Sequence, residues 1–87
     1  MSIRIEFYGI CRHRAGVASI DVAAANLGDV IGQVAARLPQ LAGLCLADGR
    51  LQAGYVANVI GRTFTTDPAT PLVSGDTVLF LSADVGG

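Results

Sequence analysis

The sequence predicts one α+β domain in which a mixed sheet of four to five strands is covered on one face by a single helix. Three observations support this fold class. Apolar and polar residues alternate at both ends of the chain, an apolar stripe with helical spacing lies between them, and turn signals separate the segments. The chain has 87 residues, of which 52% are apolar, so it is long enough for one packed domain and too apolar for a disordered chain.

The N-terminal segment has the two-residue period of a strand with one buried face. Ile3, Ile5 and Phe7 alternate with more polar neighbours. Residues 17–23 predict a second strand, and the polar segment 9–16 predicts the turn between the two. We therefore expect a hairpin at the N-terminus.

A helix is expected over residues 27–38. Asn26 can cap it by accepting a hydrogen bond from the backbone of Asp29, and Pro39 cannot continue it. The apolar stripe consists of Leu27, Val30, Ile31, Val34, Ala35 and Leu38. Two interior glycines weaken the helix, so it depends on tertiary packing, and Gly32 allows a close approach to the sheet.

The second half of the chain supplies the remaining strands. Residues 41–52 show a loose pattern and predict a loop that contains the turn signal Asp48-Gly49. Residues 55–60 have strand composition, and Phe64 begins a further short strand.

The last strand is expected over residues 77–81. Its alternation places Val78 and Phe80 on the core, and Leu79 and Leu81 on the opposite face. The chain therefore divides into a domain and a tail, with bounds 1–81 and 82–87.

Composition excludes several classes of function. The formal net charge is −1, and the six basic residues are scattered along the chain, so no basic stripe exists for nucleic acid. All six are arginine, and without lysine the chain cannot be a lysine-linked target of itself. Neither a signal peptide nor an apolar run of about 18 residues is present, so we expect a cytoplasmic protein with no membrane partner.

The residues that usually carry chemistry are sparse. Cys11 and Cys45 form no C-x-x-C pair and are expected to be buried free thiols, so no metal site is predicted. His13 lies between two arginines without an acid or a serine placed as a relay, and is expected to be solvated. The chain is therefore not expected to bind a cofactor of its own or to be an enzyme by itself.

The sequence ends in Gly86-Gly87, directly after the last strand and a short spacer. Two glycines have no Cβ, so such a tail can enter a narrow channel and bring its carboxylate against a nucleotide phosphate. A frayed terminus is the other interpretation of this ending.

Further short motifs occur in order along the chain: residues 3–8, Arg12, Gly16, residues 26–29, residues 56–58, Pro71-Leu72, Gly75-Asp76 and Gly86-Gly87. Through them the whole chain resembles the family of molybdopterin-synthase small subunits and thiamine sulfur carriers. Members of this family have the β-grasp, ubiquitin-like fold. The length of the chain and its first strand resemble the molybdopterin branch more than the shorter thiamine carriers.

The resemblance implies a sulfur carrier. An E1-like adenylyltransferase would use ATP to adenylate the carboxylate of Gly87, with Gly86 giving clearance. A sulfur donor of the cysteine desulfurase or rhodanese type would then convert it to a thiocarboxylate. In the molybdopterin branch the tail inserts into the catalytic large subunit of molybdopterin synthase, and sulfur passes to the pterin precursor.

A carrier also needs a docking surface. Tyr8, Leu79 and Leu81 are expected to form an exposed apolar patch beside the root of the tail. The alternative is that the loop 41–54 covers these residues.

The tail departs from the family pattern. Ser82-Ala83 and Asp84 stand where the family usually has two prolines and an apolar residue, and any partner must accommodate the charge of Asp84 beside Val85. Other functions therefore stay open: a carrier for thiamine, cysteine or another sulfur metabolite, a protein modifier that joins Gly87 to lysines of targets, or an interaction module with an inert tail.

Overall fold

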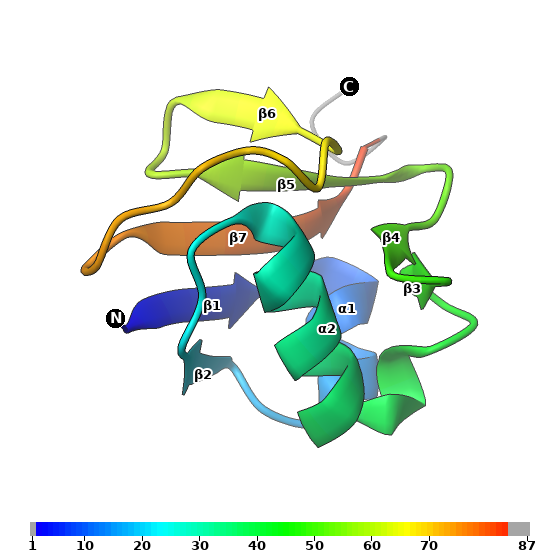
Figure 1. Ribbon diagram of the computed structural model, residues 1–87. Helices are drawn as coiled ribbons and strands as arrows, with labels where there is room; N and C mark the ends of the chain where they lie inside the picture. Colours follow the sequence, from blue (N-terminus) through cyan, green and yellow to red (C-terminus); the bar gives the residue numbers. More distant parts are fainter. Residues whose placement is uncertain (1, 84–87) are drawn as a thin grey trace.

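The structure, a computed structural model, describes residues 2–83 and shows a twisted sheet with a helix packed across one face (Figure 1). Its elements follow in the order β1 (Ile3–Phe7), α1 (Gly9–Ala15), β2 (Ser19–Val22), α2 (Leu27–Arg37), the 3-10 helix η1 (Pro39–Leu41), β3 (Leu46–Ala47), β4 (Arg50–Leu51), β5 (Tyr55–Val59), β6 (Thr63–Thr65) and β7 (Thr77–Ser82). Five strands form one sheet in the order β2-β1-β7-β5-β6, and β3 and β4 form a separate hairpin. The predicted α+β class is confirmed.

The last strand, β7, occupies the centre of the sheet. It pairs in parallel with β1, where Ile5 lies opposite Val78, and antiparallel with β5, where Val59 lies opposite the same residue. Val78 and Phe80 are completely buried, as predicted, and the ring of Phe80 meets that of Phe7 edge to face at a centroid distance of 5.9 Å. The core thus lies between β7 and the helix side of the sheet.

Helix α2 begins as the sequence predicts. The side chain of Asn26 accepts a hydrogen bond of 2.8 Å from the backbone N–H of Asp29. The two N–H groups before it, which have no acceptor within the helix, also find partners. Leu27 donates to the carbonyl of Thr70, and Gly28 donates to the carbonyl of Pro68. The first turn therefore has its backbone donors satisfied within the domain, and the connection between β6 and β7 is fixed against the helix.

The close approach in α2 occurs at Gly28 and not at Gly32, so the prediction for Gly32 was wrong. A Cβ at Gly28 would lie 3.2 Å from the carbonyl oxygen of Pro68, whereas a Cβ at Gly32 would meet nothing within 4 Å. Gly32 is exposed because it falls on the face of the helix that points away from the sheet.

The segment 9–16 forms helix α1, and the prediction of a plain turn was wrong. Cys11 and Ala15 are buried one helical turn apart, which gives this short helix its only contact with the core. Gly16 ends it in the left-handed conformation (φ 79°) and donates its N–H to the carbonyl of Arg12. Strands β1 and β2 still pair antiparallel, as expected, but a helix connects them.

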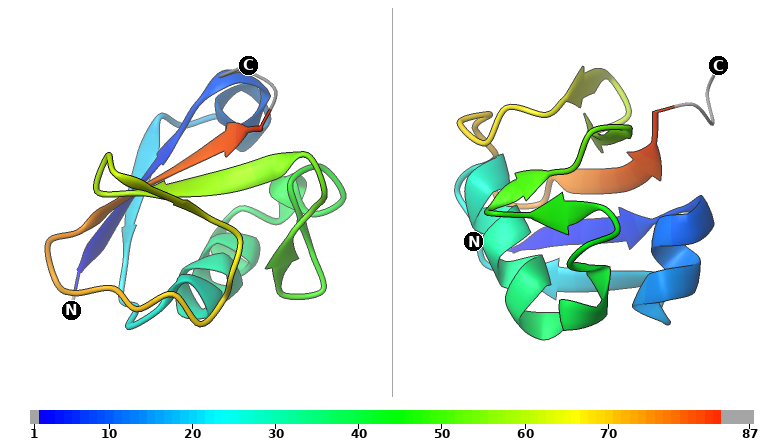
Figure 2. Two further views of the ribbon diagram at one scale, coloured as in Figure 1. Left: turned by 90° about the horizontal axis from the view of Figure 1, so that it is seen from above. Right: turned by 90° about the vertical axis from the view of Figure 1, so that its right-hand side faces the viewer.

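The loop expected over residues 41–52 contains the β3–β4 hairpin. Its turn is Asp48-Gly49, where both residues have positive φ (53° and 73°), as a two-residue hairpin requires. Leu46 is buried in the core, and the hairpin lies beside α2 on the helix side of the sheet (Figure 2).

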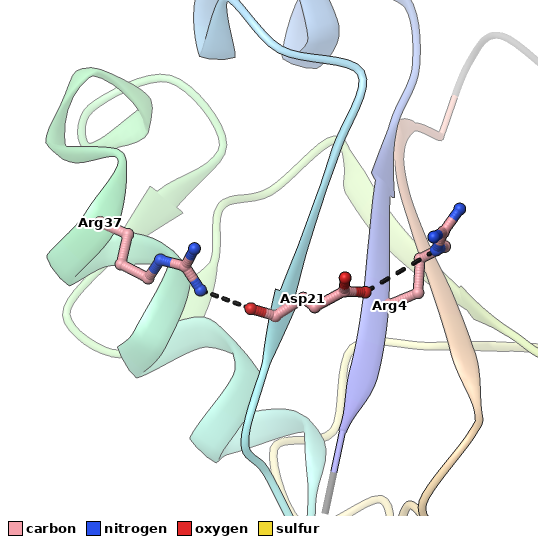
Figure 3. A network of polar contacts seen from close by, with 3 residues as sticks. All are labelled: Arg4, Asp21 and Arg37. Atoms are coloured by element: carbon pink, nitrogen blue, oxygen red, sulfur yellow. Dashed lines mark hydrogen bonds and ion pairs between the residues drawn. The ribbon is translucent and has the colours of Figure 1, made fainter.

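Two arginines, one on α2 and one on β1, contact Asp21 on the edge strand β2 (Figure 3). Arg37, at the end of α2, donates a hydrogen bond to the backbone carbonyl of Asp21 on β2. The carboxylate of Asp21 lies 3.7 Å from Nε of Arg4 on β1. Both side chains of this ion pair are more than half exposed, so we assign it little stability.

The two glycines of α2 should respond oppositely to the same substitution. Gly32→Ala should raise the free energy of unfolding by about 0.5–1 kcal/mol, because alanine is the better helix former and its methyl group has space. Gly28→Ala should lower it, because the backbone of Pro68 must move. Urea unfolding of both variants measures the difference, and equal effects would contradict this packing.

Candidate functional site

The candidate site begins where β7 ends. The backbone N–H of Ala83 donates a 2.7 Å hydrogen bond to the carbonyl of Gly54, which ties the end of the strand to the segment before β5. Of the predicted tail 82–87, Ser82 is the last residue of β7 and Ala83 is bonded to Gly54. The other predicted tail residues lie outside the described residues 2–83: Asp84, Val85, Gly86 and Gly87. Their roles stay predictions, and the site that can be described is the surface around the root of the tail.

The structure brings the three predicted docking residues together. Phe7 lies opposite Phe80 in the parallel pair, and the N–H of Tyr8 donates to the carbonyl of Phe80 at 3.1 Å. Since both phenylalanines face the core, the next residues along each strand, Tyr8 and Leu81, lie side by side on the opposite face. Leu79 precedes Leu81 by two residues and shares that face.

Sheet order adds three residues that the sequence analysis did not include in the patch. Val56 lies opposite Leu81, and Asn58 lies between Leu79 on one side and Phe64 on the other. We call the surface formed by these residues the outer face: Tyr8, Val56, Asn58, Phe64, Leu79 and Leu81. Glu6, opposite Leu79, and Thr77 lie on the same side of the sheet. Phe64 is 64% exposed, which is unusual for a phenylalanine on a sheet surface.

The segment 41–54 does not cover the outer face. Leu41, Cys45 and Leu46 are buried in the core that α2 closes, and β3 and β4 lie on the same side of the sheet as α2 (Figure 2). Only the end of the segment, at Gly54, reaches the root of the tail. The outer face is therefore on the side of the sheet away from α2.

Tyr8, which directly follows β1, is held in place by Glu6, two residues before it on that strand. Its hydroxyl donates a 2.8 Å hydrogen bond to Oε1 of Glu6. This hydrogen bond, and then the negative charge of Glu6, raise the pKa of Tyr8 above its ordinary value. The phenol therefore stays neutral and presents an exposed aromatic ring at the edge of the outer face.

The polar residues of α1 form no catalytic arrangement. Arg12 and His13 are exposed and line an open depression beside Gly16 and Val17. Residues 2–83 contain no group of three or more His, Cys, Asp or Glu side chains able to hold a metal ion. Within the same range, no helix is long and apolar enough to cross a membrane.

The two cysteines are free and fully buried, as predicted, although they meet in space. A hydrogen bond with the Cys11 thiol, followed by burial, raises the pKa of Cys45. Because both thiols are completely buried, Cys11 and Cys45 contribute to core packing and neither is a candidate nucleophile at the surface.

The pKa of Tyr8 gives a direct test of this geometry. Glu6→Ala removes both the hydrogen bond and the charge, so the pKa of Tyr8 should fall toward the ordinary value of about 10. Ultraviolet absorbance titration measures it, and Tyr8→Phe isolates the signal of Tyr55. An unchanged titration curve would show that the two side chains do not interact.

No family model matches the chain, and no curated protein matches it by sequence. Solved structures do match. SAMP1 from Haloferax volcanii superposes with a TM-score of 0.85 at 19% identity, over 100% of both chains. In the BexX/CysO complex of Amycolatopsis orientalis, the matching chain gives a TM-score of 0.78 at 19% identity, over 98% of this chain and 99% of that one.

A third match comes from the complex of subunits 1 and 2 of the molybdopterin-converting factor from Helicobacter pylori. Its TM-score is 0.65 at 15% identity, over 94% of this chain and 93% of the matching one. At such identities the likeness is one of fold, and it extends over nearly the whole of each chain. The chain has the β-grasp, ubiquitin-like fold that the sequence resemblance implied.

Proposed function

We propose that this protein is a cytoplasmic sulfur carrier whose terminal glycine, Gly87, is adenylated by an E1-like enzyme and converted to a thiocarboxylate. The observation that supports it most is the position of β7. The central strand of a ubiquitin-like fold leads toward a sequence that ends in two glycines, beside a face on which Leu79 and Leu81 are half-buried and Tyr8 and Phe64 are exposed. The carrier supplies the acyl group and the docking surface, and its partners supply the catalysis.

The chemistry needs only the carboxylate of this chain. One carboxylate oxygen of Gly87 attacks the α-phosphorus of ATP, and pyrophosphate leaves. A persulfide on the sulfur donor then attacks the activated acyl carbon and releases AMP, which leaves an acyl disulfide. A second thiol cleaves the S–S bond and forms a disulfide with the donor, so that the thiocarboxylate stays on Gly87.

The anchored end of β7 limits where this chemistry takes place. Four residues follow Ala83, and four extended residues span at most about 14 Å. A partner that rests on Leu81 must therefore hold its reactive centre within that distance of Ala83. Gly86 and Gly87 suit the narrow end of such a channel, whereas Asp84 must meet a polar or basic wall.

Intact-mass spectrometry tests the proposed modification. Protein purified from its native cell should carry a species about 16 Da heavier, since one carboxylate oxygen is replaced by sulfur, and deletion of Gly87 should abolish it. Fragmentation must place the shift on Gly87, because oxidation of Met1 adds nearly the same mass. If the shift is absent while the activating enzyme and the sulfur donor are present, the carrier proposal fails.

The outer face should affect recognition and leave the chemical step unchanged. Leu81→Ala should raise the KM of the E1-like enzyme for the carrier about tenfold and leave kcat unchanged, since it removes apolar contact area remote from the acyl group. Val73→Ala is a matched control, because Val73 is 66% exposed and precedes β7 at the end opposite the tail. Pyrophosphate exchange at varied carrier concentrations measures both constants, and equal effects of the two variants would argue against docking through this face.

Within this chemistry, we propose molybdopterin formation as the pathway, with the catalytic large subunit of molybdopterin synthase as the partner that takes up the loaded tail. The superposition on a chain of the two-subunit molybdopterin-converting factor complex supports this choice. A carrier for thiamine, cysteine or another sulfur metabolite is the alternative. Reconstitution with the purified large subunit separates the two, because only the correct acceptor discharges the thiocarboxylate.

A second candidate function is protein modification. SAMP1 superposes on this chain with a higher TM-score, 0.85, than the converting-factor subunit, and the small archaeal modifier protein from Methanosarcina acetivorans also matches. In a modifier, the activated Gly87 forms an isopeptide bond with a target lysine. Conjugates of higher mass that disappear on deletion of Gly87 would support this function.

A further inference from the structure

Asn58 is an anomaly on the outer face. It is 6% exposed and is the only buried polar residue among residues 2–83. Its side-chain oxygen, Oδ1, is buried and has no hydrogen-bond partner within this range. Most buried polar groups in proteins are paired, so an unpaired one calls for an explanation.

The free domain gains nothing from this amide. A buried carbonyl without a donor lowers stability, and asparagine is a poor strand residue. An apolar residue at this position would carry neither cost. The position of Asn58 in β5 therefore has a local disadvantage of the kind that proteins keep at functional sites.

Asn58 lies at the centre of the outer face. Leu79 of β7 is opposite on one side and Phe64 of β6 on the other, and Val56 precedes it by two residues on the same face. A partner lying on this face reaches the amide by moving Phe64, which is 64% exposed.

We propose that Asn58 is a specificity residue that accepts a hydrogen bond from the E1-like enzyme when the outer face docks on it. This inference rests on the proposed function and adds the chemistry of the partner surface: an apolar patch with one N–H donor at its centre. A partner that supplies the donor gains a hydrogen bond that the free domain lacks, whereas an apolar surface without a donor gains none and binds more weakly. The amide thus selects partners that carry the donor, and it fixes where on the outer face that donor must lie.

Two measurements on the same variants test this role. Asn58→Leu keeps a similar shape without the acceptor, so Tm should rise by roughly 4 °C while the KM for the carrier in pyrophosphate exchange rises about tenfold at unchanged kcat. Asn58→Ala should give the same rise in KM without adding side-chain volume, in case the leucine variant does not fold. Thr63→Val changes a polar residue to an apolar one on β6, on the side of the sheet opposite Phe64, and should alter neither value.

The outcomes separate the alternatives. A lower Tm for Asn58→Leu, or an unchanged KM for both variants, would overturn the proposal and make Asn58 a structural residue. If the wild-type chain itself gives no pyrophosphate exchange, the proposed function fails, and the Tm of Asn58→Leu alone then decides about Asn58. A rise would support an acceptor kept at a cost to stability for some partner, and a fall would refute it.

Discussion

The rest of the structure depends on the pairing of β7 with both of its neighbours. Parallel bonds to β1 and antiparallel bonds to β5 leave β7 with no free edge, so its backbone groups are satisfied on both sides. Its buried residues, Val78 and Phe80, form the middle of the core. The end of the strand, and therefore the start of the tail, is as firmly placed as any point in the domain.

Successive side chains of β7 point to opposite sides of the sheet, so its two faces have different roles. One face of β7 holds the domain together, and the other carries Leu79 and Leu81 toward solvent beside the tail. Because successive side chains point to opposite sides, the outward residues can be matched to a partner with little effect on the packing of Val78 and Phe80.

Much of this architecture follows from local patterns in the sequence. Alternation in β1 and β7 and the Asn26 cap of α2 are short-range signals, and each predicted its element within one or two residues. Helix α1 was missed because it is short, has no side-chain cap and buries only Cys11 and Ala15. The contact at Gly28 depends on the distant Pro68, which no local pattern indicates.

The candidate site was predictable to a similar degree. Alternation alone placed Tyr8, Leu79 and Leu81 on one surface, since it needs only the direction in which each strand points. The contribution of Asn58 and Phe64 required the order of β7, β5 and β6, which is a property of the whole fold. Its unpaired oxygen could not be predicted without the side chains that bury it.

The parallel pairing of β1 with β7 also has a consequence for biosynthesis. Ile5 finds its partner in Val78, which is made more than 70 residues later, so a nascent chain still inside the ribosome lacks the centre of its sheet. Contacts of such sequence separation form late and slow folding. The outer face is therefore complete only after β7 has joined the sheet, so a protein that binds this face selects chains that have completed folding.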